Sequence, residues 1–344
     1  MGKPLSVFCL FCVAVIMTQT GCADKAPSGK GVTNDVVVPN EQAPPGPLEP
    51  IVQTSRSGLS ATWIADGAHL QSVRLPDGTQ VLAGFAAPRD YAGDHPGLGS
   101  LVGRRELSLP LAEQADPTGE AAPVSDDAPS GLSDRYRAAV WETDHDGETL
   151  IFRHTVPVGR PPDTGHLDLT IRTWLTDREL HVRLLAITDR PTPIALTQQG
   201  HWNVAGLSGV PIDELTLQSP TDQFLTDGET RPVENTPFDL RAARPVGTEP
   251  LDFDLVAPGE GIRPMVRLTD GLRTMTLLSD YPGVRIWTGE DLGRARRLSP
   301  RAALGLSPQY APGEPGMILL PGEVYRHTII YRFDGPGFAE DPRP

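Results

Sequence analysis

Gln199 and His201 are the residues whose types and spacing most clearly suggest chemistry, and both lie in the stretch Ile194–Gly206. An imidazole can take up or release a proton near neutral pH, whereas a side-chain amide can only exchange hydrogen bonds. Residues two apart in a β-strand point to one face, about 7 Å apart. We therefore expect both side chains to line one cleft, with His201 acting as an acid, contacting a ligand, or simply packing.

Other combinations of residues give weaker evidence of a functional site. Asp144-His145-Asp146-Gly147 has metal-binding residue types, but it lies between two strand-like runs, so a solvated hairpin turn is the stronger interpretation. All lysines precede residue 31 and all cysteines precede residue 23. This excludes Schiff-base, phosphate-loop, cysteine-nucleophile and thiolate-zinc chemistry from the rest of the chain. The sequence predicts no metal and no cofactor.

The elements that must position these residues are strands. From Gly58 onward, short apolar runs alternate with turn signals, and several runs have period two. The clearest of these lie at 167–172, 180–186 and 325–331. The segment Ala112–Ser133, which contains several Pro, Gly and Asp residues, predicts a loop or an excursion from the sheet. The fold class is therefore all-β, a sandwich or barrel of many strands.

The N-terminal residues predict export. Lys3 precedes the apolar run Leu5–Met17, which is short for a membrane span, and Thr18-Gln19-Thr20-Gly21-Cys22 resembles a bacterial lipobox. We expect lipid attachment at Cys22 in the cell envelope, with simple secretion as the alternative. Composition then predicts a disordered Pro/Gly-rich tether, one folded domain and a short tail, at residues 23–56, 57–336 and 337–344.

The charge of the chain limits its partners. The formal net charge is −14, which argues against nucleic acid and against anionic lipid headgroups. Membrane contact is therefore expected only through the lipid anchor, and a neutral small molecule fits the composition better.

Four segments are similar to the patterns of one family. Ile194–Gly206 resembles Asn-Leu-Thr-Asn/Gln-His-x-Tyr-Phe-Asn-Leu-x-Gly, and Thr226–Arg241 resembles Pro-Thr-Gly-Glu-x-x-Pro-Val-x-Gly-Thr-Pro-Phe-Asp-Phe-Arg. Ser279–Gly289 resembles Thr-Asp-x-Pro-Gly-x-Gln-x-Tyr-Thr-Gly, and Pro321–Phe333 resembles Pro-Gly-Glu-x-Tyr-x-x-x-x-x-Tyr-x-Phe. These patterns belong to the aldose 1-epimerase (galactose mutarotase-like) family. The resemblance implies a single-domain antiparallel β-sandwich, the supersandwich, and a sugar as the ligand.

The resemblance also implies that both proton-transfer positions are changed. The family's acid is a histidine at the position of Gln199, and its base is a glutamate at the position of Ser307. A second family histidine has its nearest counterpart at Ser133. The sugar-contacting arginine falls on Ser108, although Arg104 keeps the first arginine of that motif. Loss of a positioned acid or base costs about 10²–10⁴-fold in rate, so little activity above the spontaneous reaction is expected.

The expected ligand is a hexose or an oligosaccharide end. Its predicted contacts are Gln199, His201, Asp252 (with Asp254 as the alternative), Trp202, Trp287 and Arg104. Three functions stay open at this point. The chain could bind sugar without interconverting anomers, it could be an active epimerase that uses His201 and another carboxylate, or it could be an envelope interaction module that has lost its sugar site.

Overall fold

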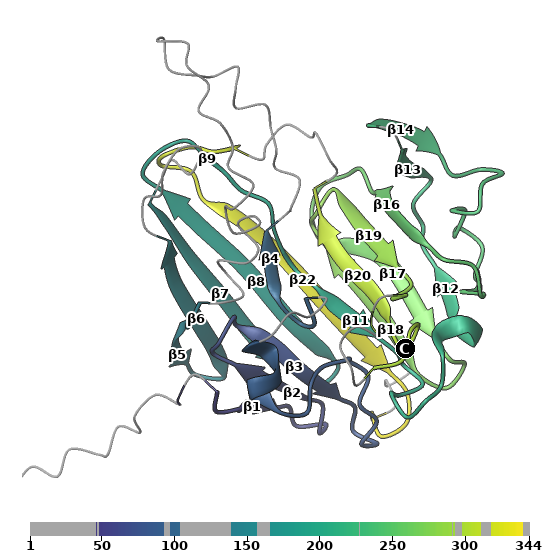
Figure 1. The fold of residues 1–344 in the computed structure, drawn as a ribbon, viewed down its shortest axis with the longest axis horizontal. Helices are drawn as coiled ribbons and strands as arrows, with labels where there is room; N and C mark the ends of the chain where they lie inside the picture. The colour runs from purple at the N-terminus through teal and green to yellow at the C-terminus, as the bar shows by residue number, and fades with distance from the viewer. Residues whose placement is uncertain are drawn as a thin grey trace, which may run out of the picture. The chain divides into compact units, whose positions relative to one another are not determined.

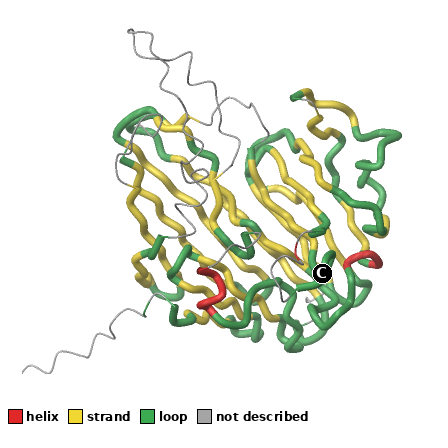
Figure 2. The backbone as a smooth tube through the Cα atoms, in the orientation of Figure 1, coloured by secondary structure: helices red, strands yellow, loops and turns green. Residues whose placement is uncertain are grey.

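Two antiparallel sheets account for most of the strands (Figures 1 and 2). The structure, a computed structural model, describes residues 46, 48–92, 97–103, 139–156, 166–226, 228–290, 292, 298–310 and 318–339. In that part of the chain, helix is limited to 3-10 turns such as η1 (Pro88–Ala92) and η3 (Ile212–Glu214). The prediction of an all-β antiparallel sandwich is confirmed.

The larger sheet has nine strands. In spatial order they are β15 (Arg244–Pro245), β12 (Thr216–Gln218), β17 (Arg263–Thr269), β18 (Thr274–Ser279), β22 (Tyr325–Asp334), β8 (Glu179–Thr188), β7 (Leu167–Leu175), β6 (Thr149–Val156) and β5 (Glu142–Asp146). The predicted strands at 167–172, 180–186 and 325–331 are confirmed as parts of β7, β8 and β22.

The second sheet has six strands. Their order is β11 (Gly200–Trp202), β20 (Leu304–Gln309), β19 (Gly283–Trp287), β16 (Asp252–Val256), β13 (Gln223–Thr226) and β14 (Glu229–Pro232). Three smaller sheets complete the set. They are β1 (Ile51–Thr54), β2 (Ser60–Ile64) and β3 (His69–Arg74); β10 (Leu196–Gln198) with β4 (Leu101–Gly103); and β21 (Ile318–Leu319) with β9 (Thr192–Pro193).

Alternating side chains explain why the two large sheets pack together. Leu167, Leu169 and Ile171 of β7 are buried, and the residues between them are only partly buried. Trp202 of β11 lies at the junction of the sheets, with its ring centroid 4.4 Å from that of Tyr331 on β22. A Cβ added at Gly200 would lie 2.2 Å from the indole nitrogen of Trp202, so only glycine leaves room for this ring.

The ordered region is longer than the sequence predicted at both ends. Residues 51–54 were expected in the tether, but they form β1, which pairs with β2 and buries Ile51. Residues 337–339 were expected in the tail, but Phe338 packs against the core and lies under the guanidinium of Arg178 at 5.4 Å. In both cases one large apolar side chain extends the core beyond a polar, Pro/Gly-rich boundary.

The segment Asp144–Gly147 forms a hairpin, as predicted. Asp144 to Asp146 belong to β5, Asp146 pairs with Thr149 of β6, and Gly147 has a positive φ of 61° in the turn. The predicted loop Ala112–Ser133 lies outside the described residues.

Candidate functional site

The six-stranded sheet has one apolar and one polar face. Its apolar side chains, such as Leu304, Leu306 and Ile286, are buried in the core. Because successive residues of a strand point to opposite sides, their neighbours form the other face. Four of them lie side by side across β11, β20, β19 and β16, and we call them the first row: His201, Gly305, Trp287 and Asp252.

A second row runs parallel to the first, two residues further along each strand. Ser307 lies opposite Arg285, and Arg285 lies opposite Asp254. Gln199 directly precedes β11, and extending the register of Gly200 with Leu306 by one residue places it opposite Ser307. The two rows together are called the polar face, and β11, β20, β19 and β16, which carry it, are neighbours in Figure 1.

Gln199 lies where the chain passes from one sheet to another. The chain pairs with β4 up to Gln198 and with β20 from Gly200 onward. The backbone N–H of Gln199 donates to the carbonyl of Ser100 at 2.9 Å. Its side-chain carbonyl oxygen lies so near Gly97 that a Cβ there would be 2.4 Å away. The amide of Gln199 therefore lies against the loop that precedes β4.

Two tyrosines hold the strand that leads to Gln199. The hydroxyl of Tyr281 donates to the carbonyl of Leu196 at 2.6 Å, and the hydroxyl of Tyr325 accepts from the N–H of Leu196 at 3.2 Å. The two hydroxyls are 2.9 Å apart. Burial raises the pKa of both phenols, so they stay protonated and able to donate. This network fixes the backbone immediately before the polar face.

A histidine–carboxylate pair supports the same region. The ring of Tyr281 stacks on His327 at 3.9 Å between centroids, and Nδ1 of His327 lies 3.2 Å from a carboxylate oxygen of Asp280. The backbone N–H of Thr328 donates to that oxygen at 2.9 Å. Burial opposes ionisation of Asp280, but these hydrogen bonds favour it by more, so the pKa of Asp280 lies below its usual value.

Asp252 and Asp254 both lie on the polar face, as the sequence predicted for the first and allowed for the second. Asp252 accepts two hydrogen bonds from Arg285, from Nε at 2.8 Å and from Nη2 at 2.9 Å. Their side chains are 51% and 49% exposed. Asp254 accepts from the amide of Gln309 at 2.6 Å.

Arg285 is a site residue that the sequence reasoning missed. The signal was present, because the pattern that matches Ser279–Gly289 has glutamine where this chain has Arg285. Arginine carries a fixed charge and a fork of donors that glutamine lacks. The polar face therefore contains a guanidinium–carboxylate pair beside the position of the changed base.

His201 packs against Trp287 on this face. The two rings meet edge to face, with centroids 5.2 Å apart and planes at 82°. A Cβ at Gly305 would lie 2.9 Å from Trp287 and 3.4 Å from His201, so glycine at this position lets the indole cross the strand. His201 is completely buried, whereas Trp287 is partly exposed. This arrangement favours packing over proton transfer as the role of His201.

Trp202 does not belong to the site, and its predicted role in sugar binding is wrong. Strand alternation turns it away from His201 and into the junction between the two large sheets, where it is fully buried. Other predicted positions lie outside the described residues. They are Arg104, Ser108, Ser133 and Cys22.

Comparison with known proteins identifies the family. The family model described as aldose 1-epimerase matches residues 131–332, which is more than half of the 344-residue chain. The chain belongs to the aldose 1-epimerase family. The resemblance inferred from the sequence is confirmed, and every residue of the polar face lies within the matched range. Membership of this family supports a mutarotase-like function with a sugar as the ligand.

Individual members of the aldose 1-epimerase family are similar to this chain over most of its length. Galactose mutarotase of Sus scrofa is 25% identical over 317 residues, which cover 82% of this chain and 93% of that protein. The structure of a GalM/aldose epimerase homologue from C. elegans has a TM-score of 0.71 at 21% identity, covering 83% of this chain and 99% of that one. Galactose 1-epimerase from Lactobacillus acidophilus has a TM-score of 0.69 at 22% identity, covering 83% and 94%.

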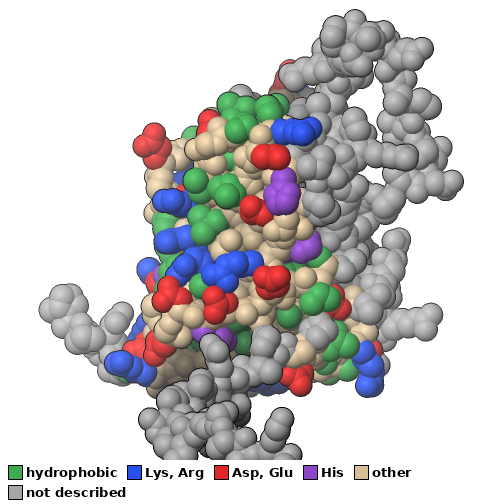
Figure 3. Space-filling view, turned by 90° about the vertical axis from the view of Figure 1, so that its left-hand side faces the viewer, with side chains coloured by type: hydrophobic (Ala, Val, Ile, Leu, Met, Phe, Trp, Pro, Cys, Tyr) green, Lys and Arg blue, Asp and Glu red, His purple; other side chains and the backbone are tan. Residues whose placement is uncertain are grey.

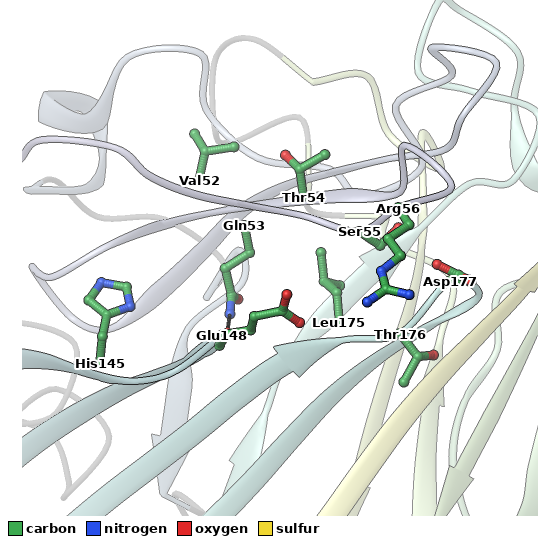
Figure 4. A pocket seen from close by; sticks show the side chains of 10 residues that line it. All are labelled: Val52, Gln53, Thr54, Ser55, Arg56, His145, Glu148, Leu175, Thr176 and Asp177. Atoms are coloured by element: carbon green, nitrogen blue, oxygen red, sulfur yellow. Dashed lines mark hydrogen bonds between the residues drawn. The ribbon is translucent and has the colours of Figure 1, made fainter.

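A separate surface pocket of about 460 Å³ lies between β1 and the turns that follow β5 and β7. Figure 4 shows polar side chains around it, and the side-chain amide of Gln53 donates to the backbone carbonyl of Glu148 at 3.2 Å. Its lining residues come from β1, β5 and β7 and from the turns that follow these strands. It shares no residue with the polar face, so the residues predicted from the family resemblance do not line it.

The described residues contain no group of three or more His, Cys, Asp or Glu side chains that could hold a metal ion. They also contain no helix long and apolar enough to cross a membrane.

Proposed function

We propose that this protein binds a hexose, or the sugar end of a glycan, on the polar face of the six-stranded sheet, and that it does not catalyse interconversion of the anomers. The observation that carries the proposal is the pair Gln199 and Ser307. Extending the register of β11 and β20 by one residue places them opposite each other, and the family resemblance assigns an acid and a base to these two positions.

Mutarotation requires two coordinated proton transfers. A base takes the proton of the anomeric hydroxyl while an acid protonates the ring oxygen, so that the bond between the anomeric carbon and the ring oxygen breaks. The free aldehyde turns and the ring closes on its other face. A side-chain amide has no proton to give at neutral pH, and a serine hydroxyl without an adjacent base cannot take one. Gln199 and Ser307 can therefore hydrogen-bond a sugar but cannot open its ring.

The rest of the polar face suits sugar binding. Arg285 and Asp252 present donors and acceptors held in a fixed relation by their two hydrogen bonds. Trp287 offers a partly exposed aromatic surface beside them, and apolar walls with a few convergent polar groups are typical of small-molecule sites.

The test combines binding and exchange on the same sample. We expect galactose or glucose to bind saturably in an NMR titration, while the rate of anomer exchange stays at the buffer value. Asp252→Asn is expected to weaken binding at least about tenfold, because a hydrogen bond to a charged group contributes about 1.5–3 kcal/mol. Asp239→Asn is a matched control, since Asp239 also accepts two hydrogen bonds from an exposed arginine, Arg241, at 2.9 and 2.7 Å.

Two outcomes would overturn the proposal. A protein-dependent exchange rate that disappears in His201→Ala would mean that the chain is an active epimerase with a substitute acid. No binding of any neutral sugar would favour an interaction module that has lost its sugar site.

We propose further that the protein is exported and anchored to a membrane through lipid on Cys22, with the following residues as a tether. The support is the sequence alone: a positive residue and a short apolar run precede a lipobox-like cysteine.

A further inference from the structure

Four arginines form a continuous band on the outer face of the nine-stranded sheet. Arg153, Arg172, Arg183 and Arg326 come from the consecutive strands β6, β7, β8 and β22, and we call them the arginine band. Their side chains alternate with the buried residues of these strands, so they point away from the core. Figure 3 shows basic side chains gathered on the side of the molecule that carries β5 to β8, with acidic side chains around them.

The register of the sheet brings these charges together. Arg172 and Arg183 are direct cross-strand partners. Arg153 pairs with Thr170, two residues before Arg172, and Arg326 pairs with Leu185, two residues after Arg183. Each outer arginine is therefore a diagonal neighbour of an inner one, about 7–8 Å away. At about 4.8 Å per strand, the band extends roughly 14 Å across the sheet.

A like-charge pair at directly opposite positions opposes folding, because the Cβ atoms lie about 4.5–5.5 Å apart. The structure compensates this only in part. Arg172 contacts Asp146 at 2.6 Å, but the Asp146 side chain is 69% exposed, and exposed ion pairs contribute little to stability. Places where a sequence breaks a local rule of stability are often functional.

Trp174 holds one of these arginines in place. The guanidinium carbon of Arg183 lies 5.3 Å from the centre of the indole, and the indole also stacks on His181 at 4.7 Å. Within the described part of the chain, no carboxylate forms an ion pair with Arg183 or Arg326. Two of the four charges thus have no counter-charge among the described residues, on a chain with 30 basic and 44 acidic residues.

We propose that the arginine band binds an acidic polysaccharide, a chain of sugars that carry carboxylates. Guanidinium groups bind carboxylates through paired hydrogen bonds. The band is narrow and carboxylates border it. Asp144 and Asp146 on β5 pair with Arg153 and Arg172 at one edge, and Glu179 lies at the start of β8. A broad anionic surface such as a membrane or a nucleic acid duplex would also meet these carboxylates, whereas a single extended chain with separated charges can follow the band.

The site is distinct from the polar face, because none of its residues belongs to the six-stranded sheet. It provides a second contact for a carbohydrate ligand, which would increase avidity if both sites engage one polymer.

The experiment measures binding of polygalacturonate to the native protein by calorimetry, with neutral dextran for comparison. We expect polygalacturonate alone to bind. Its affinity should fall when ionic strength rises from about 0.01 M to about 0.15 M, because the Debye length shortens from about 30 Å to about 8 Å. The double variant Arg172→Gln and Arg183→Gln is expected to bind at least tenfold more weakly, without a lower urea midpoint, since a repulsive pair has been removed.

The control is the double variant Arg231→Gln and Arg241→Gln, which removes the same charge from exposed arginines away from the band and should bind like the native protein. The proposal is wrong if the native protein fails to bind polygalacturonate at low salt, or if both double variants bind it equally. Binding to phosphatidylglycerol vesicles that is lost with Arg172 and Arg183 would also overturn it, because the ligand would then be a lipid surface.

Discussion

Restoring the two proton-transfer groups should give this protein mutarotase activity. The change is Gln199→His together with Ser307→Glu. Extending the register of Gly200 with Leu306 by one residue places the two positions opposite each other, and the backbone before Gln199 is fixed by Tyr281 and Tyr325. The backbone that leads to position 199 is therefore held by contacts that the two substitutions leave in place.

The size of the expected rate increase depends on how the acid and the base act together. Each group contributes about 10²–10⁴-fold, but groups that act as a unit are strongly non-additive. We expect each single variant to stay near the native rate and the double variant to exceed it at least about 100-fold. Arg285 limits the gain, because an opposite charge within about 4–6 Å lowers a carboxylate pKa by about 1–3 and makes it a weaker base. Adding Arg285→Gln should raise the rate again.

The assay is NMR exchange between the anomers of galactose and glucose, with sugar titration to show that each variant still binds. Gln198→His is the positional control, because Gln198 is buried and donates to the carbonyl of Gly99 rather than facing the site. If the double and triple variants bind sugar but exchange it at the buffer rate, the polar face is not arranged for the family reaction. If the native protein is as fast as the double variant, the reasoning about Gln199 and Ser307 fails.

Three further changes test the fold, its pH dependence and its export. Gly200→Ala places a carbon 2.2 Å from the indole nitrogen of Trp202. Such overpacking should lower the free energy of unfolding, measured in urea, by about 1–3 kcal/mol. Gly46→Ala is the control, because its new carbon lies 3.7 Å from the nearest neighbour and the free energy of unfolding should not change. The pKa of Asp280 is lowered in the fold, so its stabilisation is present above the unfolded pKa of about 3.9 and lost as pH falls through the lower folded value. Asp280→Asn should therefore lower the urea midpoint at pH 6. Below pH 4 the midpoint of the variant should fall less with pH than that of the native protein, and an unchanged pH profile would contradict this. Cys22→Ser should move the protein from the membrane fraction to the soluble fraction, and continued membrane association would argue against a lipid anchor.

Much of the fold could be predicted because its strands alternate clearly. Leu167, Leu169 and Ile171 show period two in the sequence, and β7 buries these same residues. The strand at Ile51 was missed because four residues next to a polar, Pro-rich segment have too little pattern to be recognised. Its position depends on pairing with β2 and on burial of Ile51, which are tertiary effects.

The site was harder to predict than the fold. Alternation alone indicated that His201 and Trp202 point to opposite faces, so the error at Trp202 was avoidable. The cross-strand position of Ser307 beside Gln199 depends on a register between segments more than 100 residues apart, which no local pattern contains. The importance of Arg285 became visible only when its two hydrogen bonds to Asp252 were seen.

The tyrosine network at Leu196 has a consequence for how such a protein evolves. Tyr281 and Tyr325 hold the backbone before Gln199 through the main-chain groups of Leu196, and so these contacts do not involve the side chain at position 199. A lineage can therefore change the side chain at position 199 without losing these two backbone contacts. The backbone that leads to the polar face is thus held in place by contacts that a change of side chain at position 199 leaves intact.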